Sequence, residues 1–147
     1  MTTKDDLVTV LKRLGIEDKL DEILNKSNKF GPTTKFDKDG NLIWLDLSQT
    51  GLGELPSDAF AGLDTVTELK LFKNDISSLP DDVFDTVPHL TELHLKDNNI
   101  STITPRHLEK LDHLERLFLL GNPLPNNMAR VYPNRMAVQT FLKVLES

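Results

Sequence analysis

The stretch LIWLDLSQTGLGELPSDAFAGLDT, residues 42–65, decides the fold because its pattern of apolar residues returns along the chain. The second unit begins at Val66, the third at Leu90 and a shortened fourth at Leu114, an interval of 24 residues each time. Each full unit has apolar residues at its positions 1, 4, 6, 11, 14, 19 and 22. Self-similarity at a fixed period of this length is typical of proteins built from stacked repeats.

The start of each unit alternates between apolar and other residues, which predicts a short strand. In the first unit, Leu45 and Leu47 fall on one face of that strand, and Trp44, Asp46 and Ser48 fall on the other. One unit cannot bury its leucines alone. Parallel strands stacked about 4.8 Å apart would join the leucines into a continuous core, so each repeat depends on its neighbours.

A second column of the repeat is polar. Asn74, Asn98 and Asn122 share one position, just after each predicted strand. An Asn side chain carries two donors and an acceptor, so it can satisfy peptide groups buried in adjacent loops. We therefore interpret this column as structural. In the first unit, Thr50 takes the position and can supply only part of that bonding, which an end repeat tolerates.

With these columns the units resemble the leucine-rich repeat in its 24-residue form, LxxLxLxxNxLxxLPxxxFxxLxx, over residues 42 to about 125. The prolines at Pro56 and Pro80 match the pattern, whereas Thr50 replaces the Asn and Thr104 replaces the Pro. The resemblance implies an α/β leucine-rich-repeat solenoid, with a curved parallel sheet of about four strands. It also implies a concave inner face, where members of this family most often recognise partners.

The sequence outside the repeats predicts caps for the two open ends of the stack. Apolar spacing predicts helices over residues 4–14, with Thr3 as N-cap, and over residues 18–25. A hairpin turning at residues 39–40 and a helix over residues 134–146 complete the caps. We expect one domain over residues 1–147, with an N-terminal helical cap and hairpin (1–41), repeats (42–124) and a C-terminal cap helix (125–147).

Composition excludes several classes of protein. The chain has 147 residues, 17 Lys and Arg, 23 Asp and Glu, a net charge of −6 and no cysteine. Disulfides, a thiol nucleophile and cysteine-bound zinc are therefore excluded. The acidic balance argues against nucleic acid, and no apolar stretch reaches the ~20 residues that span a bilayer. With no signal peptide at the N-terminus, we expect a cytoplasmic protein.

No motif indicates catalysis or a cofactor. The acidic stretch from Asp37 resembles a calcium loop, but Lys35 and Asp46 occupy the first and last ligand positions, so a turn is favoured. His89 and His113 lie one repeat apart, yet two imidazoles without a third ligand make a weak metal site. Neither a nucleophile elbow nor a phosphate-binding loop occurs. We expect no enzyme activity, no metal and no cofactor.

The strand residues between the leucines point outward together, and we interpret this face as the binding surface for a protein partner. The candidate partner-binding residues are Trp44, Asp46, Glu68, Lys70, Phe72, Glu92, His94, Lys96, Arg116 and Phe118. Ser48 and Leu120 share the face. Large apolar side chains among charges are usual in a protein-binding patch, although the caps could instead cover Trp44, Phe118 and Leu120.

We therefore expect a non-catalytic module for protein–protein recognition that is a monomer or weak oligomer. The alternative is a structural or targeting module that acts through its N-terminal helical cap. An exposed apolar stripe on residues 4–24 would favour that alternative.

Overall fold

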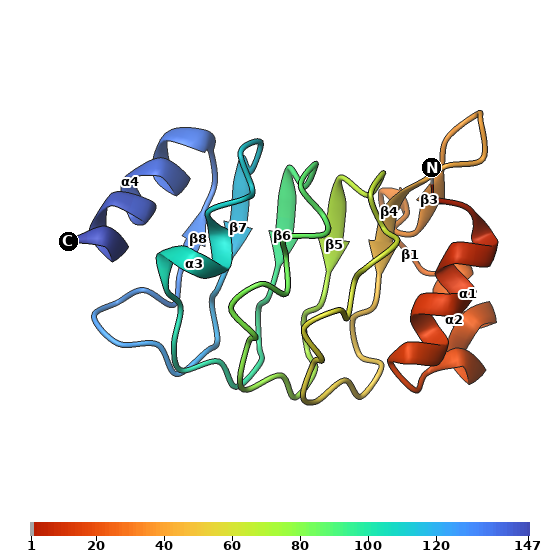
Figure 1. Cartoon of the computed structure of the whole chain (residues 1–147), viewed down its shortest axis with the longest axis horizontal. Helices are drawn as coiled ribbons and strands as arrows, with labels where there is room; N and C mark the ends of the chain where they lie inside the picture. The colour runs from red at the N-terminus through yellow and green to blue at the C-terminus, as the bar shows by residue number, and fades with distance from the viewer. Residues whose placement is uncertain (1) are drawn as a thin grey trace.

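Four parallel strands lie side by side at the interval of the sequence repeat. The computed structural model describes residues 2–147, and its parallel strands are β4 (Leu42–Asp46), β5 (Glu68–Lys70), β6 (Glu92–His94) and β7 (Arg116–Phe118). Each residue pairs with the residue 24 positions further on, as Leu69 does with Leu93. Figure 1 shows the strands in order across the molecule, with each unit looping away and returning. The expected solenoid is confirmed.

The leucine columns form the core. One leucine of each parallel strand has no exposed surface: Leu45, Leu69, Leu93 and Leu117. In the outer turns, the rings of Phe60 and Phe84 stack with their centroids 6.0 Å apart. Burying a leucine or phenylalanine contributes about 1.5–3 kcal/mol, so the stack of repeats is stabilised mainly by its interior.

The asparagine column joins each unit to the one before it. The side-chain amide of Asn98 donates to the carbonyl of Leu95 in its own unit (3.1 Å) and to that of Leu71 in the preceding unit (2.9 Å). Its Oδ1 accepts from the backbone N–H of Ile76 (3.1 Å). The structural interpretation of this column is confirmed.

Thr50 suffices in the first unit because no repeat precedes it. Its hydroxyl donates to the carbonyl of Leu47 (2.7 Å), which is the bond within the unit that the asparagines make elsewhere. Its backbone N–H donates to Oδ1 of Asn74 (3.0 Å), so the next unit supplies the remaining contact.

The N-terminal cap contains the helix α1 (Lys4–Arg13), the 3-10 turn η1 (Glu17–Lys19) and the helix α2 (Leu20–Leu24). Thr3 caps α1 through two hydrogen bonds. Its side-chain oxygen accepts from the N–H of Asp6, and the Asp6 carboxylate accepts from the N–H of Thr3. Arg13 fastens the cap to the first repeat by donating to the carbonyls of Asp58 and Ala61, both at 2.9 Å. The predicted helices and N-cap are confirmed.

Short strands complete the cap. The strands β1 (Ser27–Asn28) and β2 (Gly31–Pro32) form a separate hairpin, and β3 (Lys35–Phe36) pairs antiparallel with β4. Between β3 and β4, a carboxylate oxygen of Asp37 accepts from the N–H groups of Asp39 and Asn41, both at 2.9 Å. This acidic stretch is therefore a hairpin turn, as the sequence favoured.

The C-terminal cap adds a strand that the sequence did not predict. The strand β8 (Val131–Tyr132) pairs antiparallel with β7. The sheet therefore has six strands in the order β3-β4-β5-β6-β7-β8, of which the four predicted strands are the parallel ones and β3 and β8 are antiparallel edges. The helix α4 (Arg135–Glu146) follows, capped by Asn134, and the ring of Phe141 stacks on that of Tyr132 at 4.3 Å. The predicted cap helix is confirmed.

The third unit forms the helix α3 (Pro105–Leu108) on the outer side, where Thr104 replaces the proline of the repeat. Thr104 caps this helix, and its N–H donates to Nδ1 of His107 (3.0 Å). The other ring nitrogen of His107 lies 2.9 Å from the carbonyl oxygen of Leu79, so this buried histidine is structural. No helix within residues 2–147 has both the length and the apolar content to cross a bilayer.

Candidate functional site: the concave face of the sheet

The concave face is formed by the outward side chains of β4 to β8 and by the residues two positions beyond each parallel strand. The parallel register aligns them in three rows. The first row is Trp44, Glu68, Glu92 and Arg116; the second is Asp46, Lys70, His94 and Phe118; the third is Ser48, Phe72, Lys96 and Leu120. These are the residues that the sequence predicted to share one face. The two caps divide this face into three zones.

The N-terminal zone is covered by the cap, which corrects one expectation. Asp46 is only 5% exposed, because Lys26 and residues of the β2–β3 connection lie against it. It accepts from the N–H (2.9 Å) and hydroxyl (2.5 Å) of Ser48, and its own N–H donates to Thr34. Lys26 also donates to the carbonyl of Ser48. Asp46 is therefore a cap contact and is not available to a partner.

Trp44 is partly shielded by the same cap. The ammonium group of Lys35 on β3 lies 4.7 Å from the centre of its ring, and the side chain is half-buried. A cation over an aromatic face is attracted by the ring quadrupole. Trp44 therefore retains a solvent-facing surface at the border between the cap and the open face.

The central zone gathers charged groups. Nε2 of His94 lies 3.4 Å from Oε1 of Glu92, and the guanidinium of Arg116 lies 3.7 Å from the same oxygen. Glu68 is in register with Glu92 on the next strand. Burial, together with the neighbouring Glu92 carboxyl, raises the pKa of Glu68 to about 7. The pKa of Glu92 is lowered by His94, then by the Glu68 carboxyl and then by Arg116.

The C-terminal zone is apolar. The ring of Phe118 stacks on that of His94 with centroids 4.1 Å apart, and Val131 of β8 is its in-register neighbour. Leu120 is 46% exposed and Val131 is 39% exposed. We call Phe118, Leu120 and Val131 the apolar patch. The C-terminal segment enlarges this patch instead of covering it.

Lys70, Phe72 and Lys96 connect the zones. Lys70 and Phe72 are half-buried and line a cavity of about 430 Å³ beside the N-terminal cap, whereas Lys96 is exposed. The sequence reasoning missed Val131, because two residues of alternation are too short to indicate a strand. It also missed Phe30, which is 85% exposed in the turn between β1 and β2.

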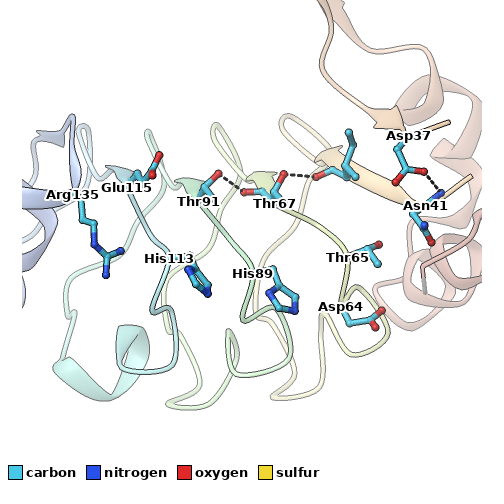
Figure 2. Close-up of a pocket in the computed structure, with 11 residues that line it drawn as sticks. Asp37, Asn41, Asp64, Thr65, Thr67, His89, Thr91, His113, Glu115 and Arg135 are labelled. Carbon is cyan, nitrogen blue, oxygen red and sulfur yellow. Dashed lines mark hydrogen bonds between the residues drawn. The ribbon is translucent and has the colours of Figure 1, made fainter. Parts of the chain in front are cut away.

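A groove of about 730 Å³ follows the edge of the sheet where the strands begin (Figure 2). Three threonine hydroxyls line it. Thr65 donates to the carbonyl of Leu42 within the first unit, whereas Thr67 donates to Ile43 and Thr91 donates to Thr67 of the preceding unit. The hydroxyls of Thr67 and Thr91 therefore tie the repeats together. The rings of His89 and His113 stack 6.3 Å apart in the same groove, and no group of three metal-ligating side chains occurs within residues 2–147.

The repeats match known family models. The description "Leucine rich repeat" applies to residues 64–124 by one model and to residues 41–63 by another, together more than half of the chain. The chain belongs to the leucine-rich-repeat family. This fold is generally a non-enzymatic interaction fold.

Solved leucine-rich-repeat structures resemble the chain. The leucine-rich repeat domain of APL1B is 32% identical over 53% of this chain, with a TM-score of 0.52, and the chain spans 23% of that domain's length. The BIR2 ectodomain from Arabidopsis thaliana is 23% identical, with a TM-score of 0.62, over 84% of this chain and 70% of its own. A search of curated proteins gave no match.

The ectodomain of the Arabidopsis thaliana receptor kinase GASSHO1/SCHENGEN3 is 21% identical, with a TM-score of 0.56, over 81% of this chain and 15% of its own. It was crystallised in complex with CASPARIAN STRIP INTEGRITY FACTOR 2. At this level of identity, the likeness of the two ectodomains to the chain extends to the fold alone.

Proposed function

We propose that this leucine-rich-repeat protein recognises a protein partner without catalysis, through the open part of its concave face. The observation that carries the proposal is the apolar patch beside the charged central zone. Leu120 reaches solvent although the repeat needs no apolar residue at that position, and Val131 of the C-terminal cap reaches solvent beside it. Exposed apolar surface bordered by charge is typical of interaction sites. The complex of GASSHO1/SCHENGEN3 lends general support, since it has the same fold.

The size of the face favours a modest interface. Four strands at about 4.8 Å spacing and three residues in depth give an area on the order of 300 Å², whereas a standard interface takes about 800 Å² from each partner. The partner would therefore also contact the borders of the face, such as Gln49, Lys73 and Asp97 or a cap, or bind weakly.

Affinity capture from the native lysate tests this proposal. The double variant Phe72→Ala with Lys70→Glu changes the concave face. The control, Met136→Ala with Lys143→Glu, likewise truncates one large apolar side chain and reverses one lysine charge, but on the exposed side of α4. We expect the first variant to lose a partner that the wild type and the second variant both retain, with unchanged melting temperatures. Equal capture by all three proteins would contradict the proposal.

The alternative, action through the N-terminal helical cap, has less support. Within residues 2–147, the exposed large apolar side chains are Phe30, Leu120, Val131, Met136 and Val144, and all lie after residue 24. Apart from the half-buried Val8, the apolar residues of α1 and α2 pack on the core. No apolar stripe therefore remains on residues 4–24 to bind a partner.

We also retain a cytoplasmic location and a monomeric or weakly oligomeric state as proposals. Both rest on the sequence, and the two Arabidopsis structures named above are ectodomains. Fractionation of the native cells and light scattering of the purified protein test them. Recovery outside the cytoplasm, or a stable oligomer at micromolar concentration, would contradict the respective proposal.

A further inference from the structure

The centre of the concave face holds two carboxyl groups next to each other. Glu68 on β5 and Glu92 on β6 are directly in register, and strands in a sheet lie about 4.8 Å apart. Like charges at this separation repel each other, and partial burial increases the cost because less water screens them. The protein tolerates this arrangement on the face that we propose for recognition.

The side chains around the pair distinguish the two carboxyl groups. Glu92 is approached by His94 (3.4 Å) on its own strand and by Arg116 (3.7 Å) on β7. Glu68 has Lys70 on its own strand, and its in-register neighbour on β4 is the uncharged Trp44. Glu92 is therefore held ionised, whereas Glu68 keeps a proton to a higher pH, as the opposite shifts of their pKa values indicate. A positive group placed beside Glu68 would replace that proton.

The apolar patch lies close to the carboxyl pair, so a partner that places a cation beside Glu68 could also place an apolar side chain on the patch. Glu92 is in register with Arg116, and Arg116 lies two residues before Phe118 on β7. Residues two apart on an extended segment point the same way and lie about 7 Å apart. One segment can therefore reach both the carboxyl pair and the apolar patch.

We propose that the partner presents a lysine or arginine side chain to Glu68 and Glu92, with an apolar residue within a few positions that packs on Phe118, Leu120 and Val131. This inference rests on the proposed function and specifies the chemistry of the partner. Charge complementarity selects the basic residue, and the exposed patch selects its apolar neighbour.

Selection from a random 12-residue peptide library displayed on phage tests the inference without knowledge of the natural partner. We expect peptides selected on the wild type to be enriched in Lys or Arg with an apolar residue within three positions. Synthetic versions should bind the variant Glu68→Gln with Glu92→Gln at least 10-fold more weakly. The matched control, Glu17→Gln with Asp18→Asn on the exposed turn η1, removes the same charge and should bind like the wild type.

The outcomes separate this inference from the proposed function. Suppose that the selected peptides lose binding to the Phe118→Ala variant and yet show no enrichment in Lys or Arg. That result would overturn the inference but leave recognition by the concave face intact. Peptides that bind equally to the wild type, to Phe118→Ala and to the double glutamine variant would contradict both.

Calorimetry supplies a second readout. Binding of a selected basic peptide at pH 7 should displace part of a proton from Glu68. The released proton is taken up by the buffer, so the measured heat of binding should depend on the ionisation enthalpy of the buffer. The variant Glu68→Gln should abolish this dependence. With a pKa of about 7 for Glu68, lowering the pH from 8 to 6 should weaken binding about 10-fold. An affinity that does not change over this range, in a peptide that needs both glutamates, would overturn the inference.

Discussion

At the scale of single residues, Asn98 tests the role of the asparagine column. Replacing it by Ala would leave the N–H of Ile76 without its side-chain partner. The carbonyls of Leu71 and Leu95 would each lose one donor but keep the side-chain amides of Asn74 and Asn122. A buried backbone group left unsatisfied costs about 1–3 kcal/mol, so we expect Asn98→Ala to lower the free energy of unfolding by about 1–3 kcal/mol. The exposed neighbour Asn99 is the control. In urea titrations, Asn99→Ala should change the free energy of unfolding by less than about 0.5 kcal/mol.

The raised pKa of Glu68 predicts how the stability of the protein depends on pH. Its pKa is raised to about 7 in the folded protein from an ordinary value of 4.5, so the folded state binds the proton more tightly than the unfolded state. Glu68 therefore destabilises the protein progressively as the pH rises from 4.5 to 7. After allowance for its partial exposure, we expect Glu68→Gln to be more stable than the wild type by about 1–2 kcal/mol at pH 8, but not at pH 4.5. A difference in stability that stays the same at both pH values would contradict the assignment.

At the scale of elements, the residue three positions after each parallel strand adopts a left-handed backbone conformation. The values of φ are 55° at Gln49, 55° at Lys73, 56° at Asp97 and 82° at Gly121. Only the last is a glycine, and a Cβ there would lie 2.0 Å from Oδ1 of Asp97. The turn is therefore common to all four units, while the crowding is specific to the last.

Two substitutions in this column should have opposite effects. Gly121→Ala adds both strain and a clash, and we expect it to lower the free energy of unfolding by about 1–3 kcal/mol. Lys73→Gly relieves the left-handed conformation and should be neutral or stabilising by up to about 1 kcal/mol. Thermal unfolding measures both, and a loss of stability in Lys73→Gly as large as that in Gly121→Ala would contradict this account.

How far the sequence predicts the elements depends on whether the signal lies within the repeat. The strands β4 to β7, the asparagine bonds and the cap helices follow from period and spacing, because each residue has a counterpart 24 positions away or an amphipathic pattern of its own. The burial of Asp46 and the exposure of Val131 do not follow. Both depend on how a cap folds back over an end repeat, which is a contact between segments with no shared periodicity.

The candidate site shows the same limit. The sequence aligned Glu68 with Glu92 and His94 with Phe118, because both pairs obey the repeat. For the charged residues of the face, the sequence predicted only that their net charge is near zero. The unequal environments of the two glutamates arise from the side-chain contacts of His94 and Arg116 with Glu92, and these distances require the folded structure.

At the scale of the whole molecule, the chain is a short stack whose two ends are closed by its own caps. The termini lie at opposite ends of the stack in Figure 1. The buried columns are continuous with the apolar faces of α1 and α4. The part of the sheet between the N-terminal cap and β8 remains open, and this is the surface that we propose for recognition.

Nuclear magnetic resonance of the protein bound to a selected peptide tests this assignment most directly. We expect the largest shifts in the methyl groups of Leu120 and Val131 and in the amides of β5, β6 and β7, with little change in α1, α2 or the edge groove at His89 and His113. Shifts confined to the N-terminal helices, to α4 or to the edge groove would contradict the claim that the concave face is the binding surface.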